Sequence, residues 1–391
     1  MKKLVLSLSI VALFLGSCSS DNEEITTDPI PTGTISGEIT TAESYPKGNY
    51  TIQGTVKVKN GGSLTIEAGS VITAVLTDGS DALLVENGGK LFLNGTAALP
   101  IVFTEASKTP GSWGGIIMVG DAPIVGAKSV ATATTEDGNN LPYGGTNATH
   151  NGGTLKYVRV EYAGKKLTDN TSEMNGFSFY SVGSGTVLEN LVAYKGADDG
   201  FEFYGGTVSA KNLISYGNFD DSFDWQDGWR GDDNTNWYAY QVGTGNYGME
   251  IEAKSINNAF GPKVSNITLT RAAGTVTEGG ASANEFDAIQ FKKEGNGEYT
   301  NVVISGYTTS NTTLTATAVR IQDKSTNDNQ ATGGKIKMLN VKINDGTSQF
   351  AGVGTTFTVD FKGNYTTSTT ATGATLTAGA WAIVDGVSLI K

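Results

Sequence analysis

The chain reads GADDGFEFY at residues 196–204 and NFDDSFDWQ at residues 218–226, one period of 22 residues later. In each stretch a small residue precedes a short strand whose side chains alternate between aromatic and polar. The same strand pattern recurs at 176–180, 248–252, 288–292 and 318–322. Between these copies stands a second series of strands that each begin with asparagine, at 190–194, 212–216, 236–240, 266–270, 301–305 and 340–344.

Two interleaved series of short strands predict a solenoid. Such a strand cannot bury its apolar face alone, but coils that stack on one another can do so. We expect one inward column, made of Phe177, Phe201, Phe223, Met249, Ile289 and Val319. A β-sandwich would not repeat the same strand pair in the same order, and a propeller blade needs about 40 residues. The sequence therefore predicts an all-β, right-handed parallel β-helix of roughly a dozen coils.

An earlier repeat extends the solenoid toward the N-terminus. VKVKNGGSLTIEAG at residues 56–69 is echoed by LLVENGGKLFLNGT at residues 83–96, with Asn-Gly-Gly at the same place in both. The asparagines of the later strands suit corner turns, where we expect their amides to bond the backbone of the next coil. We assign residues 48–391 to the β-helix domain.

The N-terminus carries an export signal. Lys2 and Lys3 precede an apolar run that is too short to span a bilayer, and the run ends in Leu-Gly-Ser before Cys18. This ending resembles a bacterial lipobox, which implies cleavage before Cys18 and lipid on its thiol. We expect a signal peptide at 1–17, a flexible acidic and Thr/Pro-rich tether at 18–47, and an outer-membrane protein that faces the cell exterior. An ordinary secretory signal with an incidental cysteine is the alternative.

Composition narrows the class of partner. The chain has 39 acidic and 27 basic residues and a net charge of −12, which argues against nucleic acid and favours cations or neutral ligands. Cys18 is the only cysteine, so a disulfide framework is excluded. His150 is the only histidine, which leaves Ser–His and Cys–His nucleophile schemes with little support.

Acidic side chains gather on the outward face of the predicted coils. If Phe201 points inward, Glu202 points outward, and Asp224 occupies the same column on the next coil about 4.8 Å away. Stacked carboxylates repel one another unless something neutralises them, and oxygen-rich clusters suit hard cations such as Ca²⁺. The candidate metal ligands are Asp198, Asp199, Glu202, Asp220, Asp221 and Asp224. The alternatives are a solvated acidic face without a ligand and aspartates that only cap turns.

Aromatic residues lie beside the same acids. By alternation Trp225 and Trp237 face inward, which leaves Trp229 and two stacked tyrosines for the surface. Exposed rings flanked by carboxylates suit a glycan, whose C–H faces pack on rings and whose hydroxyls bond to oxygens. The candidate ligand-binding residues are Tyr180, Tyr204, Trp229 and Arg230. The competing interpretation is that these rings belong to the core.

Several unusual motifs occur together in a fixed order. They are GSWGGIIMVGDAPI from Gly111, GTLKYVRVEYAG from Gly153, and the block from Asn175 through FDWQDGWRG. In this order they are similar to a widespread group of Bacteroidetes surface or secreted β-helix proteins with a pectin-lyase-like fold. The resemblance covers about residues 50–345 and implies a fold and a compartment, but no catalytic residues. Such proteins often accompany TonB-dependent receptors, so the resemblance also implies a receptor of this kind as a partner.

Other β-helices of this type are pectate lyases and polygalacturonases. GADDG at residues 196–200 loosely resembles the paired aspartates of polygalacturonases, but the Asn-Thr-Asp and Gly-His-Gly motifs of that pattern are missing. Arg230 is a lone candidate for the base of a lyase. We therefore predict a cell-surface lipoprotein that binds a glycan or another nutrient, with Ca²⁺ as the candidate cation. A polysaccharide lyase or glycoside hydrolase is one alternative, and a structural or adhesive surface protein is another.

Overall fold

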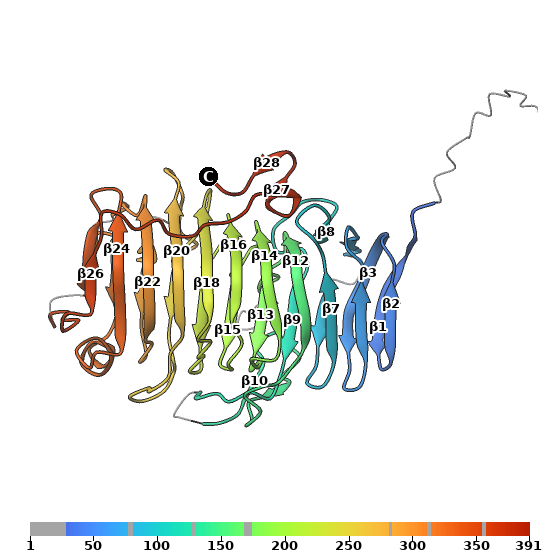
Figure 1. Ribbon diagram of the computed structural model, residues 1–391, viewed down its shortest axis with the longest axis horizontal. Coiled ribbons are helices and arrows are strands. Elements are labelled where there is room, and N and C mark those ends of the chain that lie inside the picture. Colours follow the sequence, from blue (N-terminus) through green and yellow to red (C-terminus); the bar gives the residue numbers. More distant parts are fainter. Residues whose placement is uncertain are drawn as a thin grey trace, which may run out of the picture. The chain divides into compact units, whose positions relative to one another are not determined.

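The computed structural model describes residues 29–76, 81–126, 130–167, 174–280, 284–310, 314–353 and 357–391, and residues 31–391 form one compact unit. This unit is a right-handed parallel β-helix, in which 24 strands of the described ranges join in parallel ladders. Apart from β10 and β11, which form a separate antiparallel pair, the coils stack in chain order from β1 to β26 (Figure 1). The predicted signal peptide and Cys18 lie outside the described residues. Among the residues that are described, no helix is long and apolar enough to cross a membrane.

The strands are short and differ in length from one side of the coil to the other. The first half of the unit contains β1 (Thr32–Ile39), β2 (Ala42–Tyr45), β3 (Asn49–Val58), β4 (Ser63–Ile66), β5 (Val71–Ala74), β6 (Ala82–Val85), β7 (Lys90–Asn94), β8 (Ile101–Glu105), β9 (Ile116–Val119), β10 (Ala133–Thr134), β11 (Pro142–Tyr143) and β12 (Gly153–Glu161). The second half continues with β13 (Phe177–Tyr180), β14 (Val187–Tyr194), β15 (Phe201–Tyr204), β16 (Ala210–Tyr216), β17 (Phe223–Gln226), β18 (Asn234–Gln241), β19 (Met249–Ile251), β20 (Lys263–Arg271), β21 (Ile289–Phe291), β22 (Gly297–Ser305), β23 (Thr317–Ile321), β24 (Ile336–Ile343), β25 (Ser348–Gly352) and β26 (Tyr365–Thr367). The remaining elements are the short helices α1 (Lys324–Thr326), η3 (Asn327–Ala331) and η4 (Ala380–Ala382), and the antiparallel pair β27 (Ile383–Val384) and β28 (Val387–Ser388).

The register of the strands confirms the predicted inward column. Adjacent coils pair residue for residue along Phe177, Phe201, Phe223, Met249, Ile289 and Val319. All six side chains are fully buried, and the rings of Phe177 and Phe201 stack with their centroids 5.0 Å apart. Burial of each such side chain contributes about 1.5–3 kcal/mol to folding, so this column carries much of the stability of the solenoid.

An asparagine bends each strand of the second series. Their φ angles lie between 56° and 59°, a left-handed conformation that asparagine tolerates better than most residues, at Asn190, Asn212, Asn236, Asn266, Asn301 and Asn340. The amide of Asn212 donates to Oδ1 of Asn190 over 3.0 Å, and that of Asn236 donates to Oδ1 of Asn212 over 3.0 Å. We expected these amides to bond the backbone of the next coil. For Asn212 and Asn236 this was wrong, because the equal spacing of the coils places each asparagine side chain directly over the one in the next coil.

The solenoid begins before residue 48. β1 pairs with β3, with Ile35 opposite Ile52, and β2 pairs with β4. Only Ile35 and Ile39 of β1 are buried, because this first coil covers the end of the core and leaves its other side chains in solvent. A Thr- and Gly-rich stretch with two isoleucines resembles a tether in sequence. The predicted boundary at 47/48 is therefore too late, and the β-helix starts at Thr32.

The C-terminal segment runs back along the solenoid, over the strands that contain the asparagines (Figure 1). We call residues 368–391 the C-terminal strap. The backbone N–H of Thr372 donates to Oδ1 of Asn301 over 2.8 Å, and that of Thr375 donates to Oδ1 of Asn236 over 3.2 Å. Trp381, near its end, is buried in an apolar cluster with side chains of β14, β16 and β18. The strap therefore covers one outer face of the β-helix.

Candidate functional site

All six acids that we predicted as metal ligands line one cavity. It has a volume of about 180 Å³ and lies on the outer side of β15, β17 and β19. We call it the acidic cavity. Its lining is almost wholly polar and consists of Glu136, Asp198, Asp199, Glu202, Tyr204, Asp220, Asp221, Asp224, Gln226, Glu250, Glu252, Lys254, Lys292 and Lys293.

The stacking of the coils brings these acids together. Glu202 of β15 pairs with Asp224 of β17, and Asp224 pairs with Glu250 of β19, so the predicted outward column is real. The turns before β15 and β17 align as well. Oδ1 of Asp199 accepts the backbone N–H of Asp221 over 2.8 Å, which fixes one turn on the next. Each coil therefore contributes its acids from the end of a turn and the start of a strand.

Five of the six acids form two overlapping groups. One carboxylate oxygen from each of Asp198, Asp199 and Asp220 lies within 4.8 Å of the other two. The same holds for Asp199, Glu202 and Asp224. Two ligands of a Ca²⁺ ion, each at about 2.3–2.6 Å, are at most about 5 Å apart, so either group has the spacing of a partial coordination sphere. Asp221 lies in neither group, and its Oδ1 accepts the N–H of Tyr247 over 2.6 Å.

The lysines of the cavity are paired with other acids. Lys292 contacts Glu250 over 2.5 Å, and Lys293 contacts Glu252 over 2.8 Å. Lys254 lies 3.3 Å from Glu136 and 3.5 Å from Glu252. Within the described ranges, no lysine or arginine forms an ion pair with the five acids Asp199, Glu202, Asp220, Asp221 and Asp224. The negative charge of these five is therefore not balanced by basic side chains of the cavity.

Burial and mutual repulsion change the proton affinity of these acids. Removal from water, followed by the charges of neighbouring acids, raises the pKa of Asp199, Asp221 and Asp224 well above its usual range, and burial does the same for Asp220. Burial, with a further contribution from Glu136, raises the pKa of Glu202 to about 8. Without a cation, Glu202 therefore holds its proton near neutral pH, and its acidic neighbours bind protons more readily than ordinary carboxyl groups do.

Two of the lining oxygens that accept no hydrogen bond lie on β17. Asp224 is 9% exposed and Gln226 is 3% exposed, yet Oδ1 of Asp224 and Oε1 of Gln226 have no partner among the described residues. Buried acceptors of this kind are rare in folded proteins, because leaving one unsatisfied costs about 1–3 kcal/mol. Because both residues line the cavity, we interpret the unsatisfied oxygens as places for a donor or a cation.

The tyrosines that we predicted for the surface are buried. Tyr180 and Tyr204 do stack, with ring centroids 3.9 Å apart, but they are 0% and 1% exposed. Tyr143 of β11 packs on both rings from outside, at centroid distances of 5.1 and 6.2 Å. The segment that contains β10 and β11 thus covers this column. Tyr204 still borders the acidic cavity, where its hydroxyl donates to Oε2 of Glu202.

The expectation of an exposed Trp229 is also wrong, whereas Trp225 and Trp237 are buried as predicted. Trp229 follows β17 in a turn, where strand alternation no longer sets its direction. Its ring enters the lumen and stacks on Phe203 at 4.4 Å, while its Nε1–H donates to the carbonyl of Val208 over 3.0 Å. Arg230 stays half-buried at the surface, with its guanidinium 3.7 Å from the ring centroid of Phe260, and does not line the acidic cavity.

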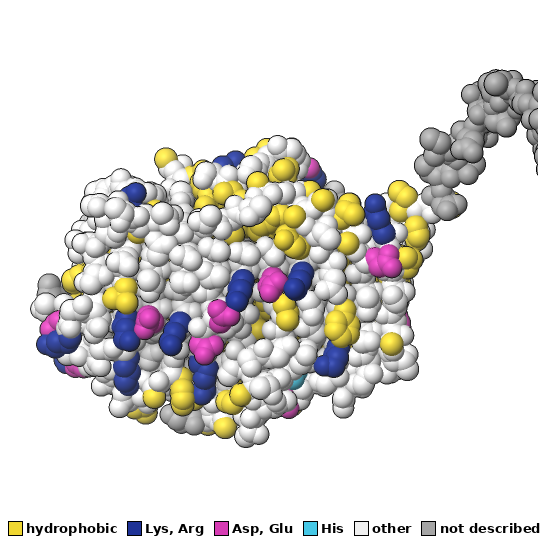
Figure 2. Space-filling view, in the orientation of Figure 1, with side chains coloured by type: hydrophobic (Ala, Val, Ile, Leu, Met, Phe, Trp, Pro, Cys, Tyr) yellow, Lys and Arg dark blue, Asp and Glu magenta, His cyan; other side chains and the backbone are white. Residues whose placement is uncertain are grey.

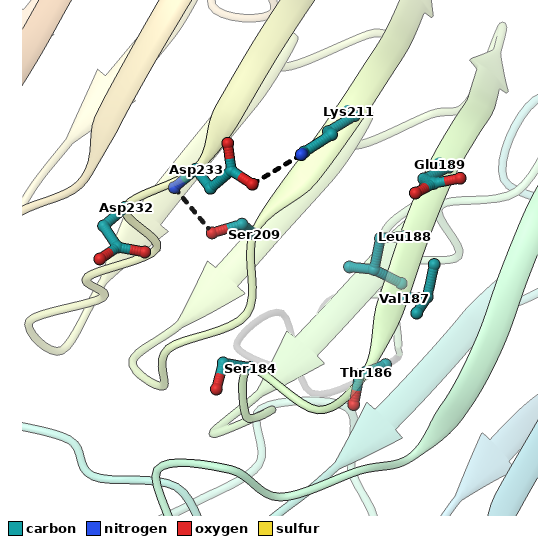
Figure 3. A pocket seen from close by; sticks show the side chains of 9 residues that line it. All are labelled: Ser184, Thr186, Val187, Leu188, Glu189, Ser209, Lys211, Asp232 and Asp233. Carbon is teal, nitrogen blue, oxygen red and sulfur yellow. Dashed lines mark hydrogen bonds and ion pairs between the residues drawn. The ribbon is translucent and has the colours of Figure 1, made fainter.

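A second hollow lies on the face formed by β14, β16 and β18. Figure 2 shows basic and acidic side chains alternating along this face, and Figure 3 shows the hollow, which has a volume of about 290 Å³. Lys211 contacts Asp233 over 2.6 Å, and Ser209 accepts the N–H of Asp233 over 3.0 Å. Glu189 pairs with Lys156 on the neighbouring strand. Most charges here neutralise one another, so this hollow is the weaker candidate.

Sequence reasoning missed part of the acidic cavity. Gln226 is the last residue of β17 and pairs with Tyr204, so the register could have identified it. Lys292 and Lys293 lie just after β21, three coils away from Glu202. Glu136 comes from the segment around β10, which belongs to no repeat, and no pattern in the chain predicts its position.

Comparison with known proteins gives one finding about the family. A family model described as a pectate-lyase-like β-helix domain matches residues 33–384. This range begins within β1, in agreement with the early start of the solenoid. No curated protein and no solved structure matches the chain.

The raised pKa of Glu202 predicts how stability depends on pH without divalent cations. An unfolded glutamate titrates near its ordinary value of 4.5, whereas folded Glu202 titrates at about 8. Between these values the folded state holds a proton that the unfolded state releases, so stability falls as pH rises from about 5 to 8. The slope is at most about 1.4 kcal/mol per pH unit for one such group. Urea unfolding in chelator should show this slope, and Glu202→Gln should make it shallower; a flat wild-type profile would contradict it.

Proposed function

The chain belongs to the family of the pectate-lyase-like β-helix domain, and from this premise we propose that it is a cell-surface binding module that holds a divalent cation in the acidic cavity. The cation, with Ca²⁺ as the first choice, would contribute to binding a glycan or another oxygen-rich nutrient. One observation carries the proposal. Five acids, four of them buried, form no ion pair with a described lysine or arginine, and one oxygen each of Asp224 and Gln226 in the same cavity lacks any donor.

The chemistry of the cavity supports a hard cation. Its acceptors are carboxylate and amide oxygens, which Ca²⁺ and Mg²⁺ prefer, and it lacks the histidine and cysteine ligands that select zinc. Ca²⁺ accepts six to eight oxygens in irregular geometry, which suits acids that come from two separate coils. A bound cation would also remove the repulsion between Glu202 and Asp224 at strand spacing.

A cation in this place would leave coordination positions for a ligand. The most exposed charged side chains of the lining are those of Lys293 and Glu136, 57% and 45% exposed, so the cavity reaches the surface beside them. Hydroxyl and carboxylate oxygens of a carbohydrate could complete the coordination sphere from that side. The buried aromatic rings no longer support a stacking platform, so the ligand proposal rests on the cation and not on Tyr180 or Trp229.

Calcium should stabilise the protein if the proposal is right. At about 100 times its dissociation constant, Ca²⁺ adds roughly 2.7 kcal/mol to the folded state, which is visible as a rise in melting temperature. We expect millimolar Ca²⁺ to raise the melting temperature above that in chelator, and Asp199→Asn to abolish the rise. Asp360→Asn, an exposed acid far along the chain that pairs with Lys362, is the matched control and should respond like the wild type. Superimposed melting curves in chelator and calcium would contradict the proposal.

A second candidate function is polysaccharide cleavage, as a lyase or a glycoside hydrolase. Glu202 supports it, because a carboxyl group with a pKa of about 8 keeps its proton at neutral pH, as a general acid must. The two functions make opposite demands on this residue, since a cation would displace the proton. A structural or adhesive role is the third candidate.

Ligand binding and product release distinguish these functions. A binding module should retain specific polysaccharides on an array in Ca²⁺, lose them in chelator, and release no shortened products. Reducing ends or unsaturated products that appear with the wild type, but not with Glu202→Gln, would favour the enzyme. If the folded protein binds Ca²⁺ but retains no polysaccharide on the array, the structural role is favoured.

The compartment is a separate part of the proposal. The lipobox-like Leu-Gly-Ser before Cys18 supports a lipid anchor in the outer membrane, and the resemblance to surface β-helix proteins supports a TonB-dependent receptor as partner. Cys18→Ala should release the protein into the soluble fraction or leave an unprocessed precursor. Membrane fractionation with mass measurement tests this, and an unchanged mature mass together with unchanged membrane association would contradict the anchor.

A further inference from the structure

We propose that the acidic cavity holds two cations side by side, with Asp199 as the carboxylate that bridges them. This inference rests on the proposed cation site and adds its stoichiometry and the role of each ligand. Asp198 and Asp220 would complete the ligand set of the first cation, and Glu202 and Asp224 that of the second.

The geometry of the acids supports two sites. The close carboxylate oxygens fall into two groups of three that share only Asp199. One group is made by the turns before β15 and β17, and the other adds Glu202 and Asp224 from the strands themselves. A carboxylate has about four lone-pair positions, and Asp199 uses one on the N–H of Asp221, which leaves positions on both oxygens. In two-metal sites the ions lie about 3.5–4 Å apart, a distance that one bridging carboxylate spans.

The unpartnered oxygens point to a ligand independently of the acid count. The side chain of Gln226 is only 3% exposed. Its Nε2 donates to Oε1 of Glu202 over 3.0 Å, whereas its own Oε1 accepts no hydrogen bond. Oδ1 of Asp224, on the same coil, also lacks a donor. These two oxygens belong with the second group, so the strand side of the cavity calls for a cation of its own and not only the turn side.

Charge balance favours two ions over one. Asp199, Glu202, Asp220, Asp221 and Asp224, which form no ion pair with a described lysine or arginine, carry five negative charges when ionised. One divalent cation would leave a charge of about −3 in a buried space, whereas two leave about −1, and buried uncompensated charge is strongly unfavourable. The volume of about 180 Å³ corresponds to about six waters of roughly 30 Å³ each, which is enough for two ions and a few waters.

Titration with Ca²⁺ and with Mn²⁺ tests the stoichiometry on the full chain purified in detergent. By calorimetry the wild type should bind two Ca²⁺ per chain, Asp220→Asn and Asp224→Asn one each, and Asp199→Asn should weaken both at least tenfold. With Mn²⁺ the wild type should give the exchange-coupled spectrum of two neighbouring ions in electron paramagnetic resonance. Each single-site variant should give the spectrum of an isolated ion.

The outcomes separate this inference from the function on which it rests. No heat with either metal would overturn the proposed function. One ion per wild-type chain, weakened alike by Asp220→Asn and Asp224→Asn, would overturn the bridged pair and keep a cation site. Asp360→Asn is the control and should bind as the wild type does. Melting by circular dichroism checks that each variant is folded, and Asp198→Asn replaces Asp220→Asn if the latter does not fold.

Discussion

The equal spacing of stacked parallel strands is the constraint on which the other features of this protein depend. Coils about 4.8 Å apart place every side chain over its counterpart one period away. On the inner side this register stacks Phe201 on Phe223, and on the outer side it sets Glu202 against Asp224. Apolar stacking stabilises the solenoid, whereas stacking of acids opposes it. The repeat that builds the core therefore also concentrates negative charge at one place.

This constraint decides what the sequence could reveal. Columns follow from the period alone, so the inward column and the column of Glu202 and Asp224 were predicted correctly from strand alternation. Whether an outward-facing column is exposed depends on segments outside the repeat, which the period does not predict. Tyr143 belongs to such a segment, and it packs on Tyr180 and buries it. Trp229 stands in a turn, where alternation ends and packing in the lumen decides its direction. Sequence reasoning thus located the acids but misjudged their burial and that of the aromatic rings.

Burial makes the charge state of the acidic cavity depend on what occupies it. In water, Glu202 and Asp224 would ionise with modest repulsion, but away from water each must be neutralised by a proton, a basic group or a cation. The basic groups are engaged with Glu250 and Glu252, so protons and cations remain as competitors for the same oxygens. The stability of a repeat fold is roughly the sum of the stabilities of its coils and of the contacts between neighbouring coils. Favourable coils elsewhere can therefore offset a few coils that the buried acids destabilise.

Access to the cavity is limited by the chain itself. The segment with β10 and β11 covers the tyrosine column beside the acids. The charged lining groups that reach furthest into solvent, Lys293 and Glu136, have opposite signs. The lining as a whole has nine carboxylic acids and three lysines, so its field favours cations over anions. This preference is strongest inside, where Asp199 and its neighbouring carboxylates are least exposed to solvent and their interactions are least screened.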